Sequence, residues 1–363
     1  MRWCALAEAC SVERVDLAAP ASVRESSVLA DHTTLRVGGK ASRFVVARTE
    51  ADLVREVLDC DRRGEPLLVL SGGSNLLVSD EGFDGTVVRV ATTGIHADVS
   101  DCGGALVRVE AGVVWDDLVA AAVEREWSGI EALSGIPGLV GATPIQNVGA
   151  YGTDVAQTIA SVRTLDRTTG QFATFPLVEC GFGYRTSRFK AEPGRYVVLQ
   201  VSFQFPLGQA SAPIRYAELA SRLGVAVGQR ADSADVRDAV LAIRAGKGMV
   251  LDEADHDTWS AGSFFTNPIV AADAPLPEGA PRFAAGDGLV KTSAAWLIDH
   301  AGFAKGYGND RAALSSKHVL ALTNRGAATA SDVVALAREV RNGVERAFGI
   351  VLVPEPVLVG LTL

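Results

Sequence analysis

The sequence predicts a protein of mixed helices and strands with more than one domain. Its 363 residues are enough for two or three domains with substantial cores. A content of 48% apolar and 21% charged residues is typical of a compact globular chain. From about Leu29, short apolar runs alternate with segments that are apolar on one helical face, which favours packed layers of helices and strands.

The elements expected in the first half form α/β units followed by a glycine-rich passage. In chain order they are a helix over 50–64 that Gly64 ends, two strands around a glycine turn within 66–90, a strand over 105–112, a helix over 114–127, and an aperiodic passage over 128–152. An aperiodic passage of that length inside a compact domain is usually functional.

The second half is rich first in strands and then in helices. We expect a hairpin around Gly170, a strand over 195–207, helices over 233–246, 292–302 and 331–349, strands over 263–270 and 318–324, and two apolar runs within 350–360. The segment 244–259 is the best candidate for a domain boundary.

Charge and cysteine usage disfavour several classes of protein. The net charge of −9 comes without a run of Lys or Arg that could follow a phosphate backbone, which argues against nucleic-acid binding. Five scattered cysteines contain no CxxC pair, so we expect neither a disulfide framework nor a zinc site. No apolar run reaches membrane-spanning length, and Glu8, Glu13 and Arg14 interrupt the N-terminal stretch before a signal-peptide core could form. These features predict a cytoplasmic protein.

The acidic segment from Asp252 to Asp257 offers carboxylates and His256 as conceivable metal ligands. Acidic surface clusters are common, whereas metal sites need defined ligand spacing. We therefore expect a solvated loop here and no metal site.

Two glycine clusters stand in place of the usual nucleotide-binding fingerprints. The chain has no Walker A motif, GxSxG elbow or HExxH motif. Instead, Gly72 and Gly73 follow a buried strand in SGGSN, and glycines recur in GIPGLVGATPIQNVGAYG. Either cluster could place backbone N–H groups against phosphates, and a tight turn is the alternative for each.

The clusters belong to a set of motifs that resembles one known family. LSGGSNLLVSDEGFDGTVV, IPGLVGATPIQNVGAYG, FGYRTSRFK, AGSFFTNP and VPEPV occur in the order found in UDP-N-acetylenolpyruvoylglucosamine reductases, flavoproteins of peptidoglycan precursor synthesis. The match runs from about Thr33 to Gly360.

The resemblance implies an α+β fold of three domains. Two of them form an FAD-binding unit of the vanillyl-alcohol-oxidase/PCMH-like type, and the third is an α/β substrate-binding domain. The implied boundaries are an N-terminal extension over 1–24, a first FAD-binding part over 25–93 joined by 347–363, a second part over 94–243, and the substrate-binding domain over 244–346.

The resemblance implies non-covalent FAD as cofactor and NADPH as co-substrate. The residues expected to bind FAD come from the two glycine clusters and one further glycine: Ser71, Gly72, Gly73, Ser74, Asn75, Leu76, Gly112, Ile136, Pro137, Gly138, Gly141, Ala142, Thr143, Asn147, Gly149, Ala150, Tyr151 and Gly152. The chain departs from the family pattern at Ser71, where a third glycine is common, and at His32, where an asparagine often stands. Neither change removes a chemical group.

The resemblance also implies a reaction, in which hydride passes from NADPH to flavin N5 and on to the β carbon of the enolpyruvyl ether of UDP-N-acetylenolpyruvoylglucosamine. Arg185 matches an arginine whose planar fork suits the substrate carboxylate and neutralises the developing enolate. Ser263 matches the proton donor to the α carbon, and Glu355 an acidic residue paired with the carboxylate and that carbon. The alternatives are a salt-bridge arginine, a strand serine and an exposed turn glutamate.

At the nucleotide end of the substrate, the resemblance implies three further residues. Tyr216 matches the tyrosine of one family subtype that closes on the diphosphate, and Lys247 and Asn267 fall where the family has diphosphate and uridine contacts. A core tyrosine, a helix-end lysine and a strand-end asparagine are the alternatives. We expect a monomer without nucleic-acid or membrane partners.

Three other functions are alternatives to the reductase activity that the resemblance implies. An oxidase with histidine-tethered flavin would need a histidine in a glycine cluster, and neither cluster has one. A non-catalytic UDP-sugar-binding module would have no need of a proton donor. A dehydrogenase that binds only a dinucleotide would need a Rossmann fingerprint, which is missing.

Overall fold

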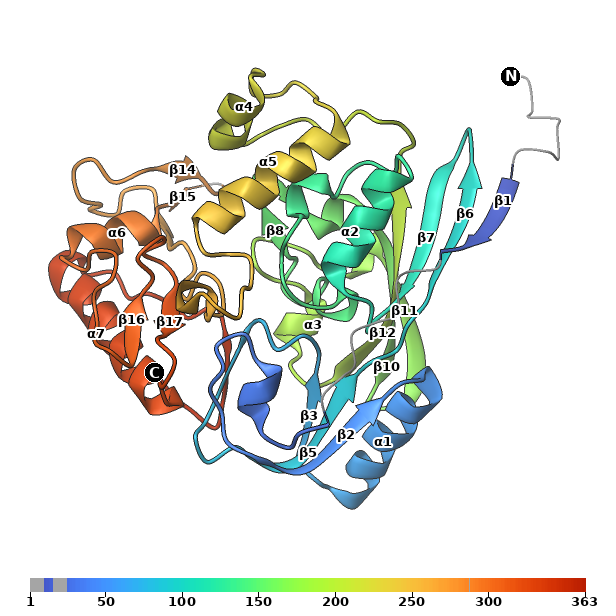
Figure 1. Ribbon diagram of the computed structural model, residues 1–363, viewed down its shortest axis with the longest axis horizontal. Coiled ribbons are helices and arrows are strands. Elements are labelled where there is room, and N and C mark those ends of the chain that lie inside the picture. The colour runs from blue at the N-terminus through green and yellow to red at the C-terminus, as the bar shows by residue number, and fades with distance from the viewer. Residues whose placement is uncertain (1–9, 16–24, 287) are drawn as a thin grey trace. The chain divides into compact units, whose positions relative to one another are not determined.

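The computed structural model describes residues 10–15, 25–286 and 288–363, which form two compact units (Figure 1). Unit 1 comprises 43–72 and 85–244 together with the described residues up to Glu25. Unit 2 comprises 26–42, 73–84 and 245–363. Both units mix helices and strands, as the sequence predicts.

The main sheet of unit 1 has six strands, and each pair of neighbours runs antiparallel (Figure 1). In spatial order the strands are β1 (Cys10–Arg14), β6 (Ile95–Ser100), β7 (Gly104–Glu110), β12 (Tyr196–Phe205), β10 (Ile159–Asp166) and β11 (Gln171–Pro176). β1 comes from the predicted N-terminal extension, whose residues 1–9 and 16–24 lie outside the described residues.

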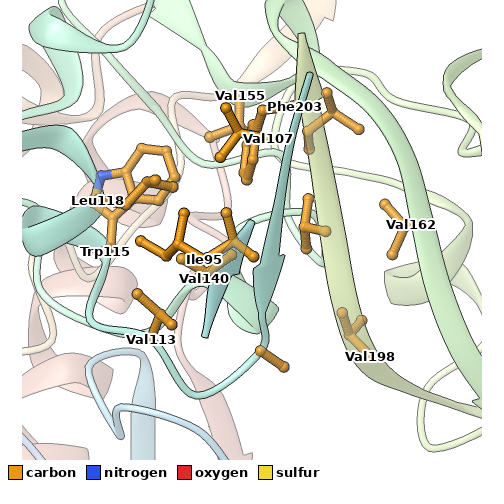
Figure 2. Packing of buried hydrophobic residues seen from close by; sticks show 14 of the residues in the cluster. Ile95, Val107, Val113, Trp115, Leu118, Val140, Val155, Val162, Val198 and Phe203 are labelled. Carbon is orange, nitrogen blue, oxygen red and sulfur yellow. The ribbon is translucent and has the colours of Figure 1, made fainter. Parts of the chain in front are cut away.

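Helix α2 (Trp115–Glu124) contributes fully buried side chains, Trp115 and Leu118 among them, to the core of unit 1. Trp115 and Leu118 lie in one apolar cluster with Ile95, Val107 and Phe203 of the sheet (Figure 2). Burying a large apolar side chain stabilises a fold by about 1.5–3 kcal/mol. This packing fixes the start of α2 relative to the sheet.

A smaller sheet of unit 1 has the order β2-β5-β3 (Ala41–Ala47, Phe83–Val90, Leu67–Leu70), and β3 runs parallel to β5. Helix α1 (Glu50–Arg63) lies between β2 and β3 in the chain, and Thr49 caps its start. Gly64 ends it in the left-handed conformation, φ 64°, which confirms the C-cap expected from the sequence.

The remaining elements of unit 1 lie at the end of the glycine-rich passage and beyond it. They are β8 (Gly149–Ala150), β9 (Thr153–Asp154), α3 (Arg188–Ala191), α4 (Ala217–Leu223) and α5 (Ser233–Gly246). Residues of α4 and α5 form a separate apolar cluster that includes Ala132 of the glycine-rich passage. Arg237 of α5 also makes a bidentate ion pair with Asp116 of α2, at 2.7 and 2.8 Å.

Unit 2 is built on short strands and two helices. The strands are β4 (Leu76–Val78), β13 (Ile269–Ala271), β14 (Phe283–Ala284), β15 (Leu289–Lys291), β16 (Ala312–Leu314), β17 (Leu322–Asn324) and β18 (Val357–Val359), and the helices are α6 (Ala294–His300) and α7 (Ala330–Phe348). β4 and β18 pair in parallel. Leu35, Leu77 and Phe264 pack with the apolar face of α7 in one core.

Most predicted elements are present, but two predicted strands are wrong in extent. Of 263–270, the structure makes only Ile269–Ala271 part of a strand, and of 318–324 only Leu322–Asn324. The first apolar run after Gly349 forms no strand, whereas the second forms β18. In the two predicted strands, Phe264, Phe265, Val319 and Leu320 are buried outside a regular strand, because packing rather than strand pairing covers them.

The structure also describes the features that bear on membranes, thiols and metals. Among the described residues, no helix is long and apolar enough to cross a bilayer. Cys60, Cys102 and Cys180 are free thiols, and Cys4 lies outside the described part of the chain. In the acidic segment, Asp257 accepts hydrogen bonds from Ser316 Oγ at 2.5 Å and Arg325 at 2.8 Å.

Candidate active site

The two predicted glycine clusters meet in unit 1. A Cβ on Gly72 would lie 2.5 Å from Gly138 Cα, so the two backbones touch where no side chain fits. Gly138 is held in place because its carbonyl accepts a 3.0 Å hydrogen bond from the backbone N–H of Trp115. Gly141 likewise donates to the carbonyl of Ala111 at 2.9 Å. The contact brings together two loops whose glycines, Gly72 and Gly138, are 66 positions apart in the sequence.

The residue before this contact carries an unsatisfied polar group. Ser71 Oγ is buried, and within the described residues it has no hydrogen-bond partner. A buried hydroxyl without a partner is costly and is usually completed by a ligand or water. The Gly72–Gly138 contact, called here the backbone cradle, leaves backbone that no side chain covers. Together with the buried Ser71 hydroxyl, it fits a phosphate-bearing cofactor.

Two acidic residues, one buried and one partly exposed, support the start of the glycine-rich passage. Glu131 is 1% exposed and accepts 2.6 Å hydrogen bonds from the backbone N–H groups of Gly129 and Ala212. Asp116 accepts from Gly135 N at 2.6 Å. Burial would raise the pKa of Asp116, but its bonds with Arg237 and Gly135 lower it overall. Neither carboxylate was predicted from the sequence. The one feature of the sequence that could have indicated them is that each acidic residue stands beside apolar residues.

Arg185 is bound to the backbone of the glycine-rich passage. Its Nη2 donates to Gly149 O at 2.7 Å and its Nη1 to Asn147 O at 3.4 Å. In return, Asn147 Nδ2 donates to Gly183 O at 3.1 Å. The passage and the segment that carries Arg185 therefore hold each other in one geometry.

Strained backbone is concentrated in the same place. Asn147, Tyr151 and Arg185 have φ of 48°, 51° and 53°, and they are three of the five non-glycine residues with positive φ in the described chain. Such conformations cost about 1–3 kcal/mol each and persist where the surroundings enforce them, which is common at functional sites. This clustering supports the predicted role of these residues.

Tyr216 lies against the glycine-rich passage and is accessible. Its ring meets that of Tyr151 edge-on, with 5.4 Å between centroids. Tyr216 is 42% exposed, so it is not the core tyrosine of the alternative interpretation. Burial raises the pKa of Tyr151, opposed by the positive charge of nearby Arg244.

Unit 2 brings Ser263 and Glu355 onto neighbouring segments. The backbone N–H of Glu355 donates to Phe264 O at 2.8 Å, and that of Thr266 donates to Val353 O at 3.0 Å. Phe264 is fully buried, whereas Ser263 and Glu355 are partly exposed. Glu355 is therefore less exposed than the alternative interpretation, an exposed turn glutamate, expects.

The end of the first glycine cluster joins the same segment of unit 2. Asn75 Nδ2 donates to Glu355 O at 3.3 Å, and Val357 N donates to Asn75 O at 2.9 Å. At Gly73 a Cβ would lie 1.8 Å from His32 O, so a side chain is excluded there too. Three predicted site residues, Asn75, Ser263 and Glu355, thus lie on adjoining segments.

The two predicted nucleotide-end residues of unit 2 differ in setting. Asn267 Oδ1 accepts from Ala294 N at 2.9 Å, at the start of α6. Lys247 follows α5 and is half-buried.

The predicted site residues divide between the units. Unit 1 holds Ser71, Gly72, Gly112, Ile136, Pro137, Gly138, Gly141, Ala142, Thr143, Asn147, Gly149, Ala150, Tyr151, Gly152, Arg185 and Tyr216. Unit 2 holds Gly73, Ser74, Asn75, Leu76, Lys247, Ser263, Asn267 and Glu355.

The fold and the glycine cradle define an FAD-binding oxidoreductase, and residues 41–175 match the family model described as FAD binding domain. Residues 253–359 match a second family model, UDP-N-acetylenolpyruvoylglucosamine reductase, C-terminal domain. The chain belongs to the UDP-N-acetylenolpyruvoylglucosamine reductase family.

Three relatives show how far the similarity extends. The UDP-N-acetylenolpyruvoylglucosamine reductase of Cutibacterium acnes is 62% identical over 98% of this chain and 96% of its own. That of Thermobifida fusca is 55% identical over 92% of this chain and 97% of its own. The crystal structure of the Thermus caldophilus reductase has a TM-score of 0.62 and 27% identity, covering 96% of this chain and 99% of that one. The predicted family, fold class and FAD cofactor are confirmed.

Proposed function

We propose that this chain reduces UDP-N-acetylenolpyruvoylglucosamine to UDP-N-acetylmuramate, with NADPH as the reductant. The observation that carries the proposal is the 62% identity, along nearly both whole chains, to a reductase of that name. FAD, held by the Gly72–Gly138 cradle, would supply hydride transfer between the nicotinamide and the enolpyruvyl carbon. The other steps fall to side chains of this protein.

Arg185 is the proposed partner of the substrate carboxylate. Its guanidinium is fixed by the carbonyls of Gly149 and Asn147, so its position is set before substrate arrives. A pre-positioned positive charge stabilises the negative charge that develops when the double bond of the unsaturated acid is reduced. Holding the charge in place avoids a reorganisation cost during the reaction.

Ser263 is the proposed proton donor to the α carbon. A serine hydroxyl is a poor acid in water, but it can donate to a developing carbanion where water is excluded. The buried rings of Phe264 and Phe265 provide an apolar wall directly after Ser263. Glu355 would lie beside the same carbon, because its backbone is bonded to Phe264.

The rest of the proposal follows the sequence predictions. Tyr216, Lys247 and Asn267 would bind the nucleotide end of the substrate, and the domain boundaries would be those given above. The proposal also includes a monomer and, from the cysteine usage and the interrupted N-terminal apolar stretch, a cytoplasmic location. Size-exclusion chromatography with light scattering would test the monomer.

The function can be tested by anaerobic mixing. NADPH added to the purified, FAD-loaded protein should bleach the flavin absorbance, and UDP-N-acetylenolpyruvoylglucosamine added next should restore it. The proposal fails if the protein takes up no FAD, or if the bleached flavin does not respond to that substrate.

A further inference from the structure

An arginine that the resemblance does not assign lies beside the cofactor loop of unit 1. Arg89 is on β5, the central strand of the sheet β2-β5-β3, where it pairs with Leu70, the last residue of β3. The glycine cluster begins at the next residue, Ser71. Arg89 Nη1 donates a hydrogen bond to Ser71 O.

The charge of Arg89 is not balanced within the described residues. Neighbouring arginines of the same unit have carboxylate partners: Arg43 pairs with Glu56 at 2.7 Å, and Arg163 pairs with Glu50. Arg89 makes no such pair in the part of the chain that the structure describes, and burial lowers its pKa to about 10 with no acid opposing the shift. The guanidinium is still charged at neutral pH, and a largely buried charge without a counter-ion is strongly unfavourable.

Two independent observations at the loop itself point to an anion. Ser71 Oγ is buried and unpartnered among the described residues, and the Gly72–Gly138 contact leaves backbone without covering side chains. Proteins bind phosphate with cationic side chains, hydroxyl groups and backbone that no side chain covers. This loop has all three next to one another. An acidic side chain is missing from this set.

We propose that Arg89 is the cationic anchor of the FAD-binding loop, and that Arg89 and Ser71 Oγ together form a subsite for the FAD diphosphate. The inference rests on the proposed function, since it needs FAD as the ligand. By its bond to Ser71 O, Arg89 also sets the geometry of the loop that forms the subsite.

The test is a titration of apoprotein with FAD and, separately, with riboflavin, which carries the flavin ring but no phosphate. For Arg89→Met we expect the Kd for FAD to rise about 10- to 100-fold, the scale of one charge-assisted hydrogen bond. The Kd for riboflavin should stay within about two-fold of the parent value. Arg43→Met, in the same sheet but in a surface ion pair, is the matched control and should leave both constants unchanged.

A loop-shaping role without phosphate contact would weaken FAD and riboflavin equally, and that result would overturn the proposal, as would an unchanged Kd for FAD. Ser71→Ala tests the subsite even if Arg89→Met does not fold. Because Ser71 Oγ bonds no described protein group, this variant should keep the unfolding temperature of the apoprotein and raise the Kd for FAD about 3- to 10-fold. An unchanged Kd for FAD in Ser71→Ala would also overturn the proposal. If the parent itself bound no FAD, the proposed function would fail first.

Discussion

Substituting Gly72 by alanine tests whether the contact between the two glycine clusters is as tight as the structure shows. The new Cβ would lie 2.5 Å from Gly138 Cα, 3.1 Å from Gly138 C and 3.3 Å from Leu139 N. Carbon atoms in contact lie about 3.5–4.0 Å apart, so one loop would have to retreat by roughly 1 Å. Gly72 does not have positive φ, and the expected effect is therefore steric alone.

The retreat is opposed by the bonds that hold the Gly138 loop. Gly138 O accepts from the fully buried Trp115, and Val140 N donates to Val113 O at 2.9 Å. Overpacking of this kind typically costs about 1–3 kcal/mol. Since the same backbone forms the cofactor cradle, we expect Gly72→Ala to lower the unfolding temperature of the apoprotein and to weaken FAD binding at least about tenfold, which corresponds to about 1.4 kcal/mol.

The first assay is thermal unfolding of the apoprotein. The second is titration with FAD, in which the quenching of flavin fluorescence reports binding. Gly246→Ala is the matched control, because an added Cβ there meets nothing within 4 Å and the residue is helical. That variant should keep FAD affinity and be equally or slightly more stable, as alanine favours helix over glycine. Parent-like stability and FAD affinity in Gly72→Ala would refute the steric reasoning.

Three further outcomes are expected. In Ser263→Ala, NADPH should still bleach the flavin, while reoxidation by the enolpyruvyl substrate should slow about 10²- to 10⁴-fold in stopped flow; parent rates in both half-reactions would rule out the proton-donor role. In Arg185→Lys, kcat/KM should fall because one ammonium cannot replace the fork that also binds Gly149 O, and unchanged kinetics would remove Arg185 from the mechanism. Asp116→Asn should lower the free energy of unfolding at pH 7, because folding lowers the pKa of the Asp116 carboxyl and the ionised group therefore stabilises the folded state. This stabilisation is fully present above about pH 4 and is lost as the pH falls through the folded-state pKa. Urea unfolding at pH 7 and pH 3 should show the gap from the parent shrinking in acid, and an equal gap at both would contradict the assignment.

Local patterns in the sequence predicted elements that depend on local interactions. The helix predicted over 233–246 is α5 with the same bounds, and the hairpin predicted around Gly170 is the β10–β11 pair. These elements are determined by helical periodicity, by caps and by turn residues that act within a few positions. The family motifs then predicted the fold class and the cofactor.

Features that depend on distant partners were not predictable in this way. The sequence predicts a strand from Ser263 to Val270, but Phe264 N donates to Leu320 O and Phe264 O accepts from Glu355 N, so the segment is fixed by two separate stretches. The role of Arg89 was hidden for a similar reason. A single charge in the run GTVVRV does not reveal how deeply its side chain is buried or whether an acid faces it.

The path of the chain between the two units has a consequence for dissecting the protein. Unit 2 takes Leu35 and Leu77 of its core from segments far upstream of residue 245, and its strand β18 pairs with β4 from the first of the glycine clusters. A fragment beginning at residue 245 would therefore lack part of its own interior and one member of a strand pair. No single cut in the backbone releases unit 2 whole, so exchanging it between relatives requires transplanting three separate stretches at once.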